Sequence, residues 1–124
     1  MTRLDTPVLF LATSNPQRSR AFYERVLGLK LVADDPFALV FAVGDSTLRI
    51  QKVERVHAPP YTTLGWNVRD IRTTIRQLRE TGAVFERYEG MPQDADAIWR
   101  SPSGAQIAWL KDPDGQTLSL TQLP

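Results

Sequence analysis

An internal repeat covers most of the 124-residue sequence and constrains the fold more than any other feature. Three pairs of segments correspond between the two halves: 11–15 with 66–70, Gly28 with Gly82, and 44–51 with 114–121. Their offsets are 55, 54 and 70 residues, respectively. A repeat with one order of elements predicts duplicated units that pack against each other. We therefore expect a single domain, residues 1–124, with a first module at about 7–53 and a second at about 62–122.

Apolar periodicity and turn residues predict the element order β-α-β-β-β in both halves. The first-half elements are a strand at 8–13, a helix from Pro16 that Asn15 caps and Gly28 closes, and strands at 29–32, 38–43 and 47–52. The second-half elements are a strand at 63–68, a helix that Asp70 caps and Gly82 closes, and strands at 83–86, 106–111 and 117–121. This order predicts the α+β class.

The rise in offset from 54 to 70 locates sixteen extra residues in the second half, within about 87–104. Segments of this length are usually lids, binding loops or disordered. Trp99 lies in this segment and is a candidate lid aromatic for a ligand site. Asp94 and Asp96 also lie there, and we expect them to form a solvated acidic loop, with a general acid/base pair as the alternative.

Charge and composition exclude several classes of function. Fifteen basic and fourteen acidic side chains give a net charge of +1, which argues against a protein that binds the phosphate backbone of nucleic acids. The basic strip of the second predicted helix, Arg72, Arg76 and Arg79, is therefore expected to be a solvated face. The absence of cysteine excludes disulfides, thiolate metal sites and cysteine nucleophiles.

The distribution of apolar residues bears on location. No apolar run approaches the roughly 18 residues that a membrane span needs. Residues 1–7 lack the apolar region of a signal peptide. We expect a cytoplasmic protein that has neither a membrane nor a nucleic acid as its partner.

Three stretches carry a resemblance to a known family: RSRAFYERVLGLKLV (18–32), WNVRDIRTTIRQLRETGAVFERY (66–88) and WLKDPDGQTLSL (109–120). Together they resemble the vicinal oxygen chelate superfamily, also called the glyoxalase/bleomycin-resistance/dioxygenase fold. The resemblance implies two β-α-β-β-β modules that form a cup-shaped mixed sheet with helices on the outside. Most members are dimers, so it also implies a homodimer. The fold hosts many chemistries, and the resemblance by itself selects none of them.

The metalloenzymes of this family bind their metal in the cup, through side chains of the first and fourth strands of each module. The resemblance places these four positions at Val8, Arg49, Thr63 and Ser119. Valine has no lone pair, serine and threonine hydroxyls are poor ligands, and arginine is a permanent cation. The chain therefore resembles the metal-free members of the family, and we expect no metal and no other cofactor.

The same four positions are candidates for binding an organic ligand. Arg49 is suited to an anionic or carbonyl-bearing group, unless it lies in solvent or pairs with an acid. Gln51 shares its face by alternation, and Phe10 is placed to stack on a flat ligand. The predicted ligand-binding set is Val8, Phe10, Arg49, Gln51, Thr63, Trp99 and Ser119. The alternative is that these side chains fill a collapsed core.

Three further residues have less specific predictions. Trp66 is out of phase with Thr63 and is expected to face the helices. The facing of Trp109 stays open, although an aromatic residue is usual there in the family, which favours packing. His57 is alone in the Pro-rich linker 54–61, and we expect it to be solvated.

Taken together, these features predict a metal-free protein that binds a small organic molecule, for example to sequester a drug or metabolite. One alternative is an enzyme of glyoxalase or dioxygenase type, a lyase, isomerase or ring-cleaving enzyme with a non-standard site. In one version of it Arg49 polarises a carbonyl while a lid acid moves a proton. A structural or regulatory protein with a closed cup is the third possibility. No catalytic residue can be named from the sequence.

Overall fold

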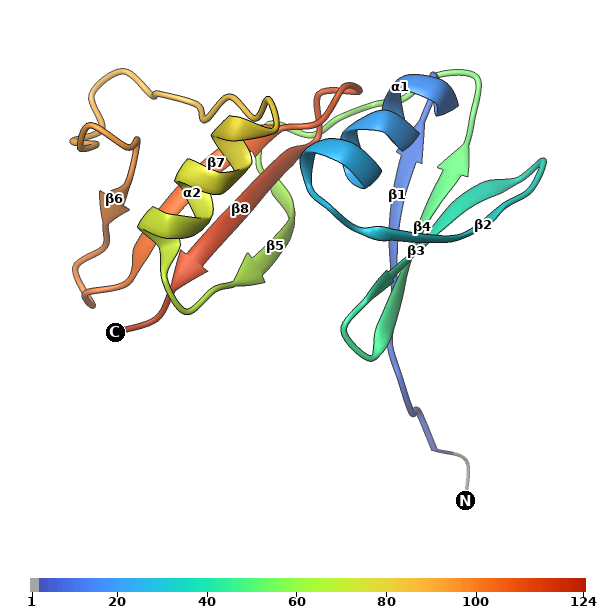
Figure 1. Ribbon diagram of the computed structural model, residues 1–124, viewed down its shortest axis with the longest axis horizontal. Helices are drawn as coiled ribbons and strands as arrows, with labels where there is room; N and C mark the ends of the chain where they lie inside the picture. Colours follow the sequence, from blue (N-terminus) through green and yellow to red (C-terminus); the bar gives the residue numbers. More distant parts are fainter. Residues whose placement is uncertain (1–2) are drawn as a thin grey trace. The chain divides into compact units, whose positions relative to one another are not determined.

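The computed structural model describes residues 3–124, and the chain divides into two compact units, 1–57 and 58–124. Each unit contains a four-stranded mixed sheet with helix on one face (Figure 1). The predicted α+β class is confirmed, and neither sheet is closed. Met1 and Thr2, the start of the segment in which we expect no signal peptide, lie outside the described residues. Within 3–124, no helix is long and apolar enough to span a membrane.

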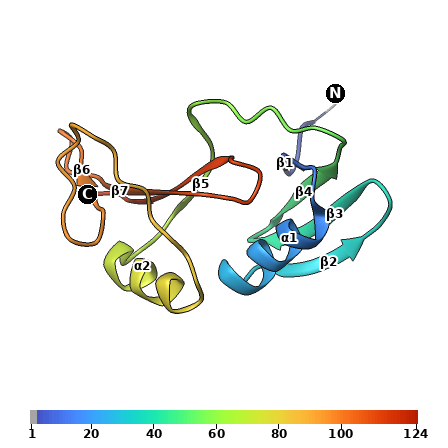
Figure 2. The same cartoon turned by 90° about the horizontal axis from the view of Figure 1, so that it is seen from above.

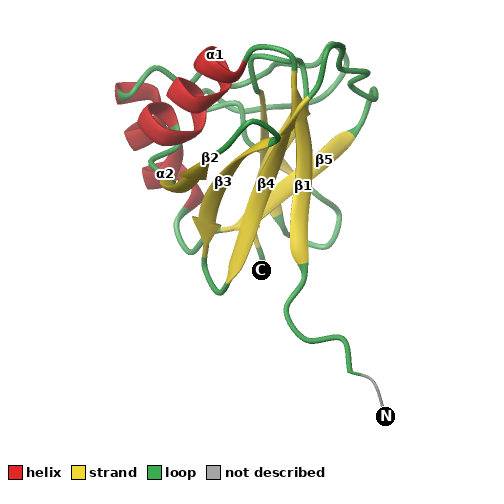
Figure 3. Ribbon diagram, turned by 90° about the vertical axis from the view of Figure 1, so that its right-hand side faces the viewer, coloured by secondary structure: helices red, strands yellow, loops and turns green. Residues whose placement is uncertain are grey.

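Unit one contains four strands and one helical segment. The elements are β1 (Val8–Thr13), α1 (Pro16–Ala21), which continues as a π-helical turn (Phe22–Val26), β2 (Lys30–Asp34), β3 (Ala38–Val43) and β4 (Ser46–Lys52). The strand order is β1-β4-β3-β2, with β1 and β4 parallel and the other pairs antiparallel (Figure 3).

Local signals define the helix of unit one as predicted. The Asn15 side chain accepts a hydrogen bond from the Arg18 backbone N–H at 3.2 Å, and Pro16 occupies the first helical position, where no backbone N–H is needed. After the helix, Gly28 has a φ of +74°, a conformation that glycine adopts without steric cost. The predicted cap and stop residues are therefore both confirmed.

One face of the first sheet forms the core of unit one. Leu11, Leu48 and Ile50 alternate onto that face and are buried. Tyr23, from the helical segment, is also buried, and its ring lies 5.8 Å from that of Phe41 on β3. The residues that alternate with these, such as Phe10 and Arg49, therefore point to the opposite face, which is open.

Unit two repeats this plan with one change. Its elements are β5 (Thr62–Asn67), α2 (Ile71–Glu80), β6 (Trp99–Arg100), β7 (Gln106–Lys111) and β8 (Thr117–Gln122). The strand order is β5-β8-β7-β6, and α2 lies on one face of this sheet (Figure 2). Asp70 caps α2 as predicted, since its carboxylate accepts from the Thr73 N–H at 3.1 Å.

The predicted strand at 83–86 is wrong. Only a single bridge forms there, between Phe85 and Leu110, and the edge position beside β7 is completed by β6, where Trp99 pairs with Ile107. Glu86 still donates its N–H to the Trp109 carbonyl of β7 at 2.7 Å, but its own carbonyl accepts from the Gln93 side chain, and after this residue the chain leaves the sheet. The extra residues thus supply their own edge strand.

Candidate functional site

Four of the predicted ligand-binding residues share the open face of unit one. Phe10 pairs in register with Arg49, and Ala12 pairs with Gln51 on the same two parallel strands. Val8 lies two residues before Phe10, so it points to the same side. Val8 is 45% exposed and Phe10 is 56% exposed, so this face presents apolar surface to solvent.

Arg49 lies between apolar neighbours on this face. Its register partners are Phe10 on β1 and Val40 on β3, and its side chain is half-buried. Among residues 3–124 it forms no ion pair, so the alternative in which Arg49 pairs with an acid is not observed. The charge of Arg49 does contribute to a lowered pKa of Asp35, although backbone N–H groups of Phe37 and Ala38 are the larger causes. The guanidinium group is therefore available to a ligand.

Thr63 and Ser119 lie on neighbouring strands of unit two. Ser119 pairs with Gly65 on β5, where a Cβ atom would overlap with the Ser119 hydroxyl oxygen. Thr63 lies at an irregularity between Thr62 and Leu64, and its hydroxyl donates to the Thr117 carbonyl at 3.3 Å. The Thr63 hydroxyl is thus engaged by the backbone, whereas Ser119 stands beside a residue without a side chain.

Three aromatic side chains gather on the same face of unit two as Ser119. Trp109 is the register partner of Ser119 on β7, and its ring lies 6.1 Å from Trp99 and 5.7 Å from Tyr88. The facing of Trp109, open at the level of sequence, is therefore toward this surface. The signal for it was alternation with buried Ala108 and Leu110.

A hollow of about 570 Å³ lies beside these rings. It is lined by residues of the linker, the inserted segment and the β7–β8 hairpin: Ala58, Pro59, Pro60, Tyr61, Thr62, Tyr88, Met91, Trp109, Lys111, Gly115 and Thr117. We call it the aromatic hollow. Burial, together with the charge of Glu86, raises the pKa of Tyr88, so its phenol stays protonated. The hollow combines aromatic and proline surface with one ammonium group, from Lys111.

The predicted residues of unit two do not line this hollow. The lining does not include Thr63, Trp99 or Ser119, although the Trp99 ring packs against Trp109, which does line the hollow. Sequence reasoning missed Tyr61, Tyr88, Met91 and Lys111, because they belong to a linker, an insertion and a strand end. The parity of Lys111 with Trp109 was the one available signal.

Comparison with protein families identifies the scaffold. Residues 4–120 match the model of the Glyoxalase/Bleomycin resistance protein/Dioxygenase superfamily. The chain belongs to this superfamily. The resemblance that the sequence showed is thus confirmed, and a search of curated proteins found no match.

Solved structures of the superfamily share the fold at low sequence identity. A bleomycin resistance determinant encoded on transposon Tn5 is 24% identical, with a TM-score of 0.71 over 97% of this chain and 98% of its own. An antibiotic-binding protein from a Streptomyces species is 19% identical, with a TM-score of 0.69 over 100% and 99%. A lactoylglutathione lyase from Agrobacterium tumefaciens is 17% identical, with a TM-score of 0.73 over 98% and 96%. At these identities the likeness establishes the fold alone.

The four side chains at the positions that the resemblance assigns to the family's metal ligands are poorly suited to a metal ion. Val8 and Arg49 lie on the open face of unit one, and Thr63 and Ser119 lie on neighbouring strands of unit two. These side chains supply two hydroxyl groups and no imidazole or carboxylate, which is a poor donor set for a divalent ion. Within residues 3–124, no group of three His, Asp or Glu side chains is placed to hold a metal ion.

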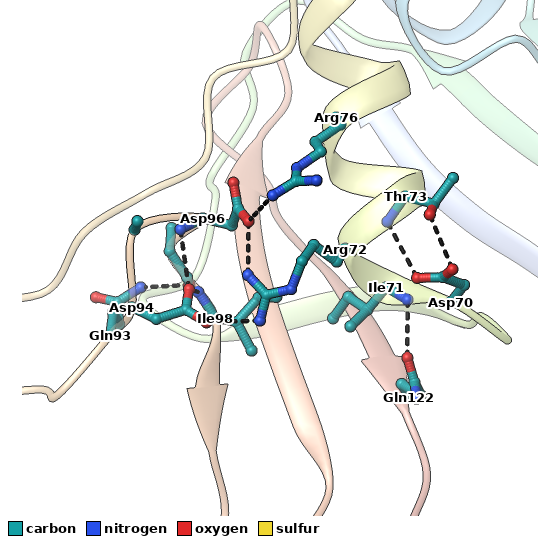
Figure 4. A network of polar contacts seen from close by, with 12 residues as sticks. Asp70, Ile71, Arg72, Thr73, Arg76, Gln93, Asp94, Asp96, Ile98 and Gln122 are labelled. Carbon is teal, nitrogen blue, oxygen red and sulfur yellow. Dashed lines mark hydrogen bonds and ion pairs between the residues drawn. The ribbon is translucent and has the colours of Figure 1, made fainter.

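The predicted solvated acidic loop is wrong for Asp96, which is buried, whereas Asp94 is exposed as expected. The Asp96 carboxylate lies 2.6 Å from Arg72 and 3.4 Å from Arg76 on α2 (Figure 4). It also lies 2.8 Å from Arg79, and the residue is only 7% exposed. Arg72 also pairs with Asp94 at 2.9 Å. The basic strip of α2 therefore contacts the inserted segment, because arginine side chains of the helix form direct ion pairs with carboxylates of the insertion.

These ion pairs also determine the protonation of the two acids. The hydrogen bond from Arg72 is the main cause that lowers the pKa of Asp96. Burial raises the pKa of Asp94, but hydrogen bonds from Arg72 and from the backbone N–H groups of Ile98 and Asp96 outweigh it and lower the pKa overall. Both groups stay ionised at neutral pH, so neither donates a proton there, and the lowered pKa also makes each carboxylate a weaker general base.

The two remaining predictions agree with the structure. Trp66 pairs in register with buried Leu120, which places it on the face opposite the aromatic hollow. His57 is exposed in the linker.

Proposed function

We propose that this superfamily member binds a small organic molecule without a metal ion, as a sequestering protein for a drug or metabolite. The observation that carries the proposal is the aromatic hollow, where Tyr61, Tyr88 and Trp109 surround a space of about 570 Å³. Ligand sites of roughly 300–1,000 Å³ with mainly apolar walls and few polar groups are typical of small-molecule binding.

The chemistry of the lining indicates the class of ligand. Aromatic side chains offer large apolar area and favourable offset or edge-to-face contacts with flat rings. Lys111 adds a positive charge that attracts an anionic substituent. A flat organic anion matches both properties, and holding it requires contact area and an anchor but no reaction.

The open face of unit one offers a second set of contacts with the same preference. Arg49 has no ion-pair partner within residues 3–124 and lies beside the exposed ring of Phe10. An unpaired guanidinium next to an aromatic surface is suited to a carboxylate, sulfonate or carbonyl group through its fork of donors. Gln51, on the same face, adds an amide that can donate or accept.

The names of two structural neighbours support sequestration as the form of binding. A bleomycin resistance determinant and an antibiotic-binding protein both adopt this fold. A lactoylglutathione lyase adopts it as well, so the fold itself does not decide between binding and catalysis. The two lid acids, the residues expected to move a proton in the enzymatic alternative, are both held as ionised partners of arginine.

We also propose that the protein forms a homodimer. The support is the open face of unit one, where Val8 and Phe10 remain exposed next to each other. Exposed apolar area of this kind is characteristic of interaction sites. Light scattering is expected to give twice the mass of 14.0 kDa for the wild type and the monomer mass for Phe10→Asp. A monomeric wild type at high concentration would contradict this part of the proposal.

The direct test is a fluorescence titration with anilinonaphthalene sulfonate, a flat aromatic anion, on protein whose metal content has been measured. We expect saturable binding that is lost in Trp109→Ala and weakened in Lys111→Met. The matched controls are Trp66→Phe, on the opposite face, and Lys30→Met, an exposed lysine of β2, and both should bind like wild type. Equal binding by all variants would show that the aromatic hollow is not the site. Tight binding of about one equivalent of a transition metal would overturn the metal-free part of the proposal.

A further inference from the structure

The inserted segment borders the aromatic hollow, although it has little regular structure of its own. Tyr88 and Met91 line the hollow, and both lie between Phe85 and the two-residue strand β6. Met91 N–H donates to the Tyr88 carbonyl, so the backbone bond here stays inside the segment. Side chains must therefore hold this wall in place.

The strongest of these side-chain contacts come from α2. Arg72 reaches Asp96 with one terminal nitrogen at 2.6 Å and Asp94 with the other at 2.9 Å, while Arg79 reaches the second oxygen of Asp96 at 2.8 Å. Arg72 and Arg79 are two helical turns apart and so lie on one face. We call Arg72, Arg79, Asp94 and Asp96 the arginine clamp.

The clamp holds a tight turn that the backbone alone disfavours. The second oxygen of Asp94 accepts from the Asp96 and Ile98 N–H groups at 2.9 and 3.0 Å (Figure 4). Between them, Ala97 has a φ of +64°, in the left-handed region that residues with a Cβ rarely adopt. This conformation persists because the carboxylates and arginines around it over-determine it.

Gln93 connects this turn to the wall of the hollow. Its amide nitrogen donates to the Ala97 and Glu86 carbonyls, both at 2.9 Å, and its amide oxygen accepts from the Tyr88 N–H at 2.7 Å. Tyr88 in turn packs edge-on against Trp109 at 5.7 Å. A continuous set of contacts therefore runs from α2 through the turn to the ring that lines the hollow.

We propose that the arginine clamp and Gln93 are positioning residues for the aromatic hollow, so that α2 determines its shape and its affinity without touching the ligand. The affinity part rests on the function proposed above, whereas the ordering of the segment does not. The geometry assigns Arg72 the central role, because it alone joins both carboxylates. Arg76 is peripheral, at 3.4 Å from Asp96 with a side chain that is 65% exposed.

The test compares variants along this set of contacts with two independent measurements. Hydrogen exchange reports the order of residues 87–98, and titration with anilinonaphthalene sulfonate reports the hollow. In Asp96→Asn and Arg72→Gln, we expect faster exchange in this segment and roughly tenfold weaker binding or more. Gln93→Leu should weaken binding while the exchange of the α2 amides stays unchanged. Arg76→Gln is the matched control and should change binding less than about twofold.

Rescue separates positioning from a general loss of structure. Asp96→Glu and Arg72→Lys keep the charges, and we expect partial recovery of both the exchange pattern and the near-ultraviolet circular dichroism of the Trp99–Trp109 pair. If Asp96→Asn does not fold, these two variants replace it in both measurements. Unchanged exchange in Asp96→Asn would overturn the clamp. Faster exchange with unchanged affinity would overturn the coupling to the hollow. Wild-type protein that does not bind the probe would contradict the proposed function, and exchange and dichroism would still decide on the clamp.

Discussion

Equivalent positions on the two sheets carry their large side chains on different strands. In unit one, Arg49 lies between Phe10 on the first strand and Val40 on the third. In unit two, Ser119 lies between Gly65 and Trp109. The aromatic side chain beside this position is therefore on the first strand of the module in unit one and on the third strand in unit two.

This difference accompanies the aromatic hollow of unit two, which Trp109 lines. Side chains opposite each other on a sheet compete for the same space. The Ser119 hydroxyl occupies the space that a side chain at position 65 would need, and on the other side of Ser119 the Trp109 ring packs against Tyr88 of the inserted segment. Duplicated modules can therefore keep one strand order while a few residues redistribute the volume available to a ligand.

The largest expected effect tests the ring on which the hollow depends. Trp109→Ala removes the aromatic group that contacts both Tyr88 and Trp99. We expect affinity for anilinonaphthalene sulfonate to fall by about 30-fold or more, as for a central binding residue. Phe10→Ala, its counterpart in unit one, should have a smaller effect on the same titration. The comparison between the units fails if Phe10→Ala is the more damaging change.

A substitution at Gly65 tests most directly whether this position must lack a side chain. The Cβ of Gly65→Ala would overlap with the Ser119 hydroxyl, and we expect a loss of about 1–3 kcal/mol in the free energy of unfolding. Urea denaturation measures this loss. The double variant Gly65→Ala/Ser119→Ala removes the overlapping oxygen and should recover most of the stability. No recovery would mean that backbone conformation, not Ser119, requires glycine.

Arg49 tests whether unit one contributes to ligand binding. Because Arg49 forms no ion pair with any described residue, Arg49→Met is expected to change the free energy of unfolding by less than about 0.5 kcal/mol. Binding of an anionic aromatic probe should weaken several-fold, and that of a neutral analogue should not. Arg55→Met, in the exposed linker, is the matched control. Equal loss for the neutral analogue would assign Arg49 a packing role.

The smallest expected effect concerns the free energy of unfolding at acid pH, which should fall by a similar mechanism in both units. Hydrogen bonds from Lys52 lower the pKa of Asp34 in unit one, and those from Arg72 lower the pKa of Asp96 in unit two. Each native carboxylate therefore binds fewer protons than in the unfolded chain. Its stabilisation is complete above about pH 3.9 and is lost as pH falls through the lower native pKa.

Urea denaturation at neutral pH and at about pH 3 checks this expectation. Asp34→Asn and Asp96→Asn should each be less sensitive to acid than wild type. Both variants should also be destabilised at neutral pH, where the wild-type carboxylates are ionised and paired. A variant that keeps the full acid sensitivity of the wild type would show that its carboxylate does not contribute.

Residues with local roles were predictable from the sequence. Asn15 and Asp70 cap their helices, and Gly28 follows the first helix with positive φ, because capping and turn formation depend on neighbours in the chain. Alternation likewise placed Phe10 with Val8 and Gln51 with Arg49, and the family resemblance put the two pairs on one face, as the register of β1 and β4 shows. The caps, the strands of unit one and the family therefore followed from the amino-acid sequence by itself.

Only the tertiary structure decided the features that depend on residues distant in sequence. Asp96 and Arg72 are 24 positions apart, and no periodicity links a loop carboxylate to a helix face. The predicted strand at 83–86 is reduced to a single bridge, and the carbonyl of Glu86 accepts instead from Gln93, a partner that alternation does not indicate. The aromatic hollow arises where the linker, the inserted segment and a hairpin meet. Local chemistry determines the elements, whereas the partners of an edge, a charge or a ring depend on which segments the fold brings together.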